Sequence, residues 1–204
     1  MLLTRQKQIG ESMGTIERDE FRSMLDSYEQ CFLAMGILLK NHLPLPTLVL
    51  LYTVIDGLGW LAAPNPKPND VRKRFCKWVD KWLLPDQVFE CNAVDIYGAR
   101  CAVLHTLTYE SHLGKIGEAR TIAYKFGGAS ETILRLAIEK APEPRTVIVD
   151  LDKLIEATRA SGARFLVYAA DNPQMSKILF ARAPSFFTHL DTSYRRFERS
   201  ADDG

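Results

Sequence analysis

The sequence predicts a mainly α-helical protein: an antiparallel helical bundle with a small β appendage and additional C-terminal helices. Three observations lead to this prediction. Apolar residues recur at helical spacing over most of the chain, Pro- and Gly-containing breaks divide these stretches into helix-length segments, and only residues 120–126 and 146–149 have the pattern of short strands. A chain of 204 residues without repeats or a linker fits a single domain over residues 15–204, with a bundle core in 15–118 and the strands and C-terminal helices in 119–204.

The first helix follows a polar, glycine-containing stretch, residues 1–14, which we expect to be a flexible leader. Thr15 can cap the helix, and three acidic residues in the first turn favour the positive end of its dipole. Apolar side chains then repeat at helical spacing up to Leu39. The helix is predicted to end at Asn41 and His42, ahead of two prolines.

The second helix, residues 48–62, is apolar on almost every side, which is typical of a central helix surrounded by others. Gly57 and Gly59 would let a neighbouring helix approach closely. Asp56 lies in the middle of this helix, and an unpaired carboxylate there would cost several kcal/mol. Asp56 is therefore expected to have a partner or to reach a polar cleft.

The third helix begins after a breaker run rich in Pro and Asn. One face is apolar and carries Val71, Phe75, Trp78, Val79 and Trp82. Another face carries Lys73, Lys77 and Lys81, the only concentrated basic surface that the sequence shows. These lysines form either a solvated face or an RNA-binding surface.

The fourth helix begins near Asn92 and is followed by a polar loop over residues 106–117. The two predicted strands come next, joined by a helix over residues 130–140. From Leu151 the pattern returns to helix, with a break at Asn172 and Pro173.

Composition limits the functional classes. The net charge is only +1, so a nucleic-acid site would have to be local. The four cysteines form no Cys-x-x-Cys pair, which excludes a zinc motif and fits reduced thiols; no metal or cofactor is expected. The first residues contain no apolar stretch long enough for a signal peptide, and the apolar run 47–63 is short for a membrane span and contains an acid, so we expect a cytoplasmic protein without membrane insertion.

Arg100 and His105 are the main candidates for chemistry. A histidine can shuttle a proton near neutrality, and a guanidinium can stabilise the charge on a phosphate under attack. Asp56 is a natural partner for either residue, and Asp95, about one turn before Arg100, could orient it as well. A five-residue separation places the two side chains roughly 140° apart on a helix, so the helix end would have to fray, or two helices or two subunits would have to form the site. The structural alternative is an ion-pairing arginine and a helix-end histidine.

Three other possible motifs are weaker candidates for a functional site. Arg182 and His189 have a similar spacing, but Pro184 between them breaks the helix that would hold both. The run from Glu110 to His112 lacks the turn that presents a nucleophilic serine, and Gly114-Lys115 lacks the glycines of a phosphate-binding loop.

The stretch from Asp95 to Thr108, together with Asp56 in an apolar second helix, resembles the HEPN (higher eukaryote and prokaryote nucleotide-binding) superfamily over roughly residues 15–108. The resemblance implies a homodimeric helical bundle acting as a metal-independent endoribonuclease in a toxin–antitoxin or defence system, with a nucleotidyltransferase-like antitoxin as a partner. It implies that Arg100 stabilises the phosphorane and that His105 is the general base or acid when the RNA 2′-OH attacks, which gives a 2′,3′-cyclic phosphate.

The chain departs from the HEPN pattern directly after the arginine. Active members often carry Asn, Asp or His there, and this chain has Cys101. The alternative function is therefore a non-catalytic nucleotide-binding or protein-interaction module of the same fold. A generic helical scaffold is the third possibility.

Overall fold

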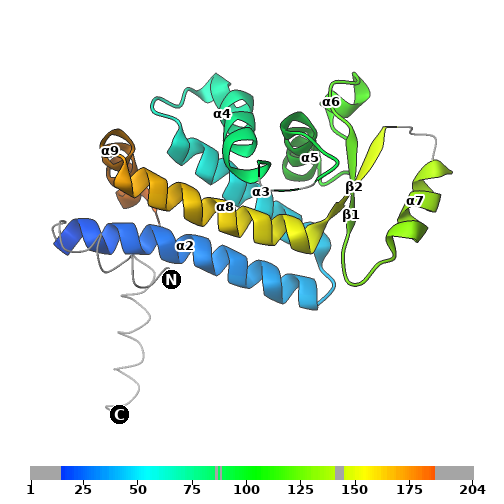
Figure 1. Ribbon diagram of the computed structural model, residues 1–204, viewed down its shortest axis with the longest axis horizontal. Coiled ribbons are helices and arrows are strands. Elements are labelled where there is room, and N and C mark those ends of the chain that lie inside the picture. Colours follow the sequence, from blue (N-terminus) through cyan, green and yellow to red (C-terminus); the bar gives the residue numbers. More distant parts are fainter. Residues whose placement is uncertain (1–14, 86, 88, 141–144, 187–204) are drawn as a thin grey trace, which may run out of the picture. The chain divides into compact units, whose positions relative to one another are not determined.

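The computed structural model describes residues 15–85, 87, 89–140 and 145–186. The predicted leader over residues 1–14 lies outside them, as does His189. The chain is mainly helical and has a small two-stranded sheet, which confirms the predicted class (Figure 1). Two compact units are present: residues 31–168 form one, and the described residues before 31 and after 168 form the other. The two strands belong to the same unit as the central helices.

Helices α2 (Thr15–Lys40) and α3 (Pro44–Ala62) follow each other closely. The break at Asn41 and His42 is where the sequence predicted it, and His42 adopts a left-handed conformation there with φ +56°. Helix α3 begins four residues earlier than predicted because Pro44 occupies its first turn. Proline is tolerated there, since the first N–H groups of a helix have no acceptor within the helix.

The third helical segment is less regular than predicted. A 3₁₀ turn, η1 (Pro68–Asp70), leads into α4 (Val71–Trp78), which continues as a π-helical turn, η2 (Val79–Leu83). The wider π turn changes the angular spacing of the side chains that follow. Leu83 consequently enters the core, and Trp82, predicted on the buried face, is only half-buried.

Helix α5 (Ala93–Thr106) begins with a reciprocal cap. The side chain of Asn92 accepts hydrogen bonds from the backbone N–H groups of Val94 and Asp95, and the Asp95 carboxylate accepts one from the N–H of Asn92. The predicted loop after α5 contains a single helical turn, α6 (His112–Lys115).

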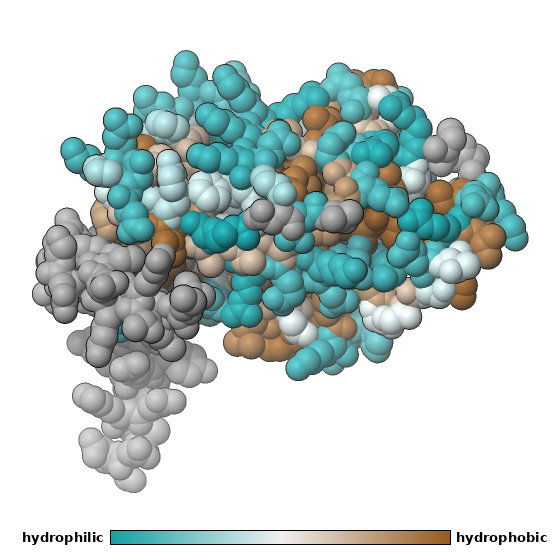
Figure 2. Space-filling view, in the orientation of Figure 1, coloured by the Kyte–Doolittle hydropathy of each residue, from teal (hydrophilic) through white to brown (hydrophobic). Residues whose placement is uncertain are grey.

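The sheet has two parallel strands, β1 (Thr121–Lys125) and β2 (Thr146–Asp150), in register from Thr121 with Thr146 to Lys125 with Asp150. Helix α7 (Glu131–Glu139) connects them, which confirms both predicted strands and the predicted helix. Ile133 and Leu136 are exposed on α7, where Figure 2 shows apolar surface.

Helix α8 (Leu151–Asp171) follows β2 without a loop and continues through Gly162. Gly162 lies against Leu58 of α3, and a Cβ there would come within 3.2 Å of the leucine side chain. Helix α3 is the centre of this unit, with Leu51, Tyr52 and Ile55 fully buried.

The other unit contains the N-terminal part of α2, helix α9 (Pro173–Arg182) and a final 3₁₀ turn, η3 (Ala183–Ser185). Its described packing is aromatic, with ring centroids 5.6 Å apart for Phe21 and Phe180 and 5.7 Å apart for Tyr28 and Phe186. Asn172 caps α9 by accepting two backbone hydrogen bonds, as the predicted break at Asn172-Pro173 requires.

Among the described residues, α3 is the one helix long and apolar enough to cross a membrane by length and composition. The helix has 19 residues, so the apolar segment is longer than the sequence suggested. Half of its apolar window is nevertheless buried inside the protein.

Candidate functional site

Asp56 and Arg100 form an ion pair between α3 and α5. The Asp56 Oδ2 accepts from Arg100 Nε at 2.7 Å and from Nη2 at 2.5 Å. Both side chains are largely buried, at 18% and 13% exposure. This contact provides the partner that the acid in the apolar second helix required. Asp56 Oδ1 is also buried and accepts no hydrogen bond from the described residues.

Burial opposes the charge on Arg100, but hydrogen bonding and Coulombic attraction to Asp56 outweigh it, so the pKa of Arg100 is raised. The guanidinium is therefore held charged and in a fixed direction. Two of its three nitrogens face Asp56, which leaves Nη1 for another group.

His105 is that other group. Its Nε2 lies 2.9 Å from Arg100 Nη1, within the same helix. A guanidinium has only donors, so Nε2 accepts in this contact and the imidazole carries its proton on Nδ1. The structure thus brings together Asp56, Arg100 and His105 as one chain of contacts.

The sequence-based condition that one helix cannot present both groups is wrong. Helix α5 does not fray before His105, because it extends to Thr106. The 140° offset describes where the two Cβ atoms point, whereas the contact is made at the far end of a long, flexible arginine side chain. Asp56 holds that end in place.

Tyr97 and Cys101 surround the arginine. The Arg100 guanidinium lies over the Tyr97 ring, 5.9 Å from its centroid, and Tyr97 packs edge-on against Phe75 of α4 at 5.4 Å. Cys101 follows Arg100 directly in α5. Burial, followed by the neighbouring Cys101, raises the pKa of Tyr97 to about 12, so the phenol stays neutral.

Tyr97 is not among the residues that the sequence predicted for the site. The signal that could have found it is its position three residues before Arg100, which places both on adjacent parts of one helix face.

Asp95 does not orient Arg100, contrary to the sequence-based expectation. Its carboxylate accepts three hydrogen bonds from Arg120, at 2.7 Å from the backbone N–H, 3.0 Å from Nε and 2.7 Å from Nη2. Asp95 is 1% exposed and also caps α5. It therefore fixes the start of β1 and the start of α5 rather than the site.

The chain after His105 leaves the helix through a left-handed residue and is tied back to α5 by hydrogen bonds. Leu107 is left-handed, with φ +54°, and its N–H donates to Val103 O at 3.2 Å, while Thr108 N–H donates to Ala102 O at 3.2 Å. The hydroxyl groups of Thr106 and Thr108 form a hydrogen bond at 2.7 Å. This loop leaves the large side chains of Leu107 and Tyr109 exposed next to His105 in the chain.

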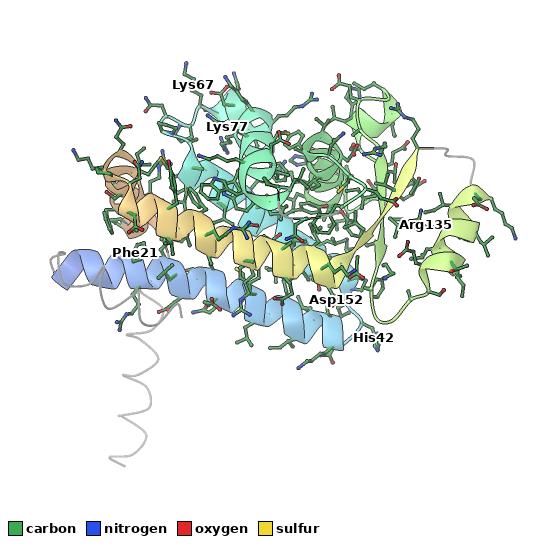
Figure 3. The ribbon with its side chains drawn as sticks, in the orientation of Figure 1. Phe21, His42, Lys67, Lys77, Arg135 and Asp152 are labelled. Atoms are coloured by element: carbon green, nitrogen blue, oxygen red, sulfur yellow. The ribbon has the colours of Figure 1, made fainter. Side chains whose placement is uncertain are left out.

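Lys73, Lys77 and Lys81 are all exposed on α4 and η2, and none contacts the Arg100 group in the described hydrogen bonds and ion pairs (Figure 3 labels Lys77). No group of three or more His, Cys, Asp or Glu side chains among the described residues is placed to hold a metal ion. The chemical groups that the site offers are a fixed guanidinium, an imidazole whose Nε2 accepts from that guanidinium, and a carboxylate.

Comparisons with protein-family models, with curated proteins and with solved structures find no match to this chain.

Proposed function

We propose that the protein is a metal-independent endoribonuclease of HEPN type whose catalytic residues are Arg100 and His105. The observation that carries this proposal is the 2.9 Å contact between Arg100 Nη1 and His105 Nε2, with Asp56 holding the guanidinium from the other side. An imidazole and a guanidinium in direct contact can both reach the same phosphate.

A substrate phosphate would take Nη1 away from His105, and Nε2 would then be free to act as a base. Nε2 removes the proton of the RNA 2′-OH, O2′ forms a bond to phosphorus, and the bond to the 5′ oxygen breaks. Arg100 stabilises the charge on the phosphorane, and the leaving oxygen takes a proton from water. The products are a 2′,3′-cyclic phosphate and a 5′-hydroxyl, and DNA, which lacks the 2′-OH, is not cut.

We also propose that helices α2 to α5 form a HEPN-type bundle and that the protein is a cytoplasmic homodimer. A nucleotidyltransferase-like antitoxin would be its partner, and Lys73, Lys77 and Lys81 would bind RNA. The resemblance of residues 95–108 supports these points. Since both side chains meet within one chain, a second subunit is not needed to bring Arg100 to His105.

The test is cleavage of a mixed RNA pool in excess EDTA. We expect cleavage by the wild type, a loss of about a hundredfold or more in Arg100→Ala and in His105→Ala, and cyclic phosphate ends in the products. Arg72→Ala and His42→Ala are matched controls because both residues are exposed. EDTA-sensitive cleavage, or cleavage that survives both site variants, would contradict the proposal.

The second candidate is a non-catalytic module. One observation favours it: Asp56 occupies two of the three guanidinium nitrogens, as in a purely structural bridge. A folded wild type that cuts no RNA, with Arg100→Ala unfolded, would favour the module.

A further inference from the structure

Two aromatic side chains and a lysine meet on the surface of the larger unit. The rings of Trp82, in η2, and Tyr168, in α8, lie with centroids 5.2 Å apart at 54°. The Lys81 Nζ lies 5.0 Å from the centroid of each ring. Tyr168 is 43% exposed, Trp82 is half-buried and Lys81 is exposed, so aromatic surface and a positive charge face solvent together.

This arrangement is fixed from below. The Trp82 ring packs edge-on against the buried Phe165 at 5.5 Å, and the Trp82 carbonyl accepts from Arg164 Nη2 at 3.0 Å. The same nitrogen lies 3.1 Å from Ser161 Oγ. Little conformational freedom remains for Trp82 to lose when a ligand stacks on it.

The π-helical turn is what brings the group to the surface. In a regular continuation of α4, Trp82 would share the buried face of Phe75 and Trp78. In η2, Leu83 is buried and Trp82 emerges beside Lys81. Such turns are rare and occur frequently at functional sites.

We propose that Trp82, Tyr168 and Lys81 bind one unpaired nucleotide of single-stranded RNA, with the base stacked on the exposed Tyr168 ring beside Trp82 and the phosphate at the ammonium group. Aromatic rings accept any base by stacking, and a neighbouring cation neutralises the backbone. Lys73 and Lys77, exposed on the preceding helix, continue the positive charge along the segment. This inference rests on the proposed function, since it makes single-stranded RNA the substrate class.

The test measures binding separately from cleavage. The probe is a fluorescein-labelled 2′-O-methyl oligouridylate of about ten nucleotides, which has no free 2′-OH to react. Tyr168→Ser should weaken binding about tenfold, and Tyr168→Phe should restore it because the ring remains. Lys81→Gln should reduce the slope of log affinity against log salt by about 0.7. Lys140→Gln, on an exposed lysine at the end of α7, is the matched control.

A second readout does not depend on a disruptive variant. The chain has three tryptophans, and the oligonucleotide should quench fluorescence in the wild type but much less in Trp82→Phe. Inorganic polyphosphate of matched charge should not reproduce the quenching. Equal binding by wild type, Tyr168→Ser and Lys81→Gln would overturn the inference, as would equal quenching by polyphosphate or no binding by the wild type.

The two proposals fail separately. Binding that depends on Tyr168 without any RNA cleavage would remove the nuclease and keep this site. Cleavage with binding that is indifferent to Tyr168 and Lys81 would do the reverse.

Discussion

At the scale of single residues, the balance of charge around Arg100 decides what the site can do. Asp56 balances the charge of the guanidinium, so an approaching phosphate meets a fixed, charged donor that is already part of an ion pair. Little of the binding free energy of a phosphate would be lost in orienting the guanidinium, because two hydrogen bonds to Asp56 already set the direction of Nη1. The carboxylate is therefore a positioning residue for the proposed reaction.

Asp56→Asn tests the strength of this pair. The substitution leaves a largely buried guanidinium without its counter-charge, and we expect the free energy of unfolding to fall by about 3 kcal/mol. The measurement is the urea-unfolding midpoint at neutral pH. Asp56→Leu combined with Arg100→Leu should recover much of the loss, because neither charge is then buried.

Glu118→Gln is the control for that experiment. Glu118 pairs with Arg72 at 2.7 Å, but the two side chains are 47% and 45% exposed. Its removal should cost less than about 1 kcal/mol. The account of the Asp56 pair is contradicted by equal losses in Asp56→Asn and Glu118→Gln.

At the scale of elements, the close approach of α5 to the segment before β1 depends on a missing side chain. A Cβ at Gly98 would lie 2.8 Å from the Cβ of the buried Ala119. Ala119 cannot easily move, because its N–H donates to Leu113 O at 3.1 Å and the next residue, Arg120, is tied to Asp95.

Two glycine-to-alanine substitutions should consequently change the free energy of unfolding in opposite directions. Gly98→Ala should lower the free energy of unfolding by about 1–3 kcal/mol through overpacking. Gly36→Ala, in α2, adds a Cβ that meets nothing within 4 Å, and should raise stability by up to about 1 kcal/mol through helix propensity. Thermal unfolding of the two variants gives the comparison, and destabilisation by both would show that backbone propensity is not the deciding factor in α2.

The elements were predictable wherever local chemistry decides them. Asn92 marks a helix start and Asn172-Pro173 a break, and both are found there. The π turn was not predictable, because the apolar spacing of Trp78 and Trp82 also fits a regular helix. In the structure Trp82 contacts Phe165 and Tyr168 of α8, and the local spacing of residues in the third helix gives no sign of partners so far along the chain.

The same division applies to the candidate site. The need of Asp56 for a partner follows from burial alone and was visible in the sequence. The pairing of Asp95 with Arg120 was not, because it joins residues 25 positions apart. The contact of Arg100 with His105 was not predicted either, because an angle around the helix axis takes no account of how far a long arginine side chain can reach.

At the scale of the whole molecule, several buried and half-buried groups hold their protons more tightly when the chain is folded. Burial is the largest cause for each: it raises the pKa of Cys76 and of Cys91 to about 11, and that of Tyr97 to about 12. Burial also raises the pKa of Tyr52 and of Tyr124, whose hydroxyl groups hydrogen bond to each other.

Stability should therefore fall on the alkaline side. The stabilising contribution of each group is complete below its unfolded pKa, about 8.5 for Cys and about 10 for Tyr, and is lost as the pH rises through the folded value. We expect the urea midpoint to drop steadily from about pH 9 towards pH 11.

The double variant Cys76→Ala with Cys91→Ala is the control, and its decline between about pH 9 and pH 10 should be shallower. A midpoint that is independent of pH over this interval would contradict the burial of these groups.

The parallel pairing of β1 and β2 affects the order in which the parts of the chain fold. Two antiparallel strands can start from a tight turn, but these strands cannot pair until the chain containing α7 has closed into a loop. Helices form from neighbouring residues and need no such closure. Helix α3 and the other helices are thus expected to condense first and the strand pair to join late. Tyr124 on β1 would then reach Tyr52 only in the final stage of folding, and the hydroxyl contact between them would report that the native state has been completed.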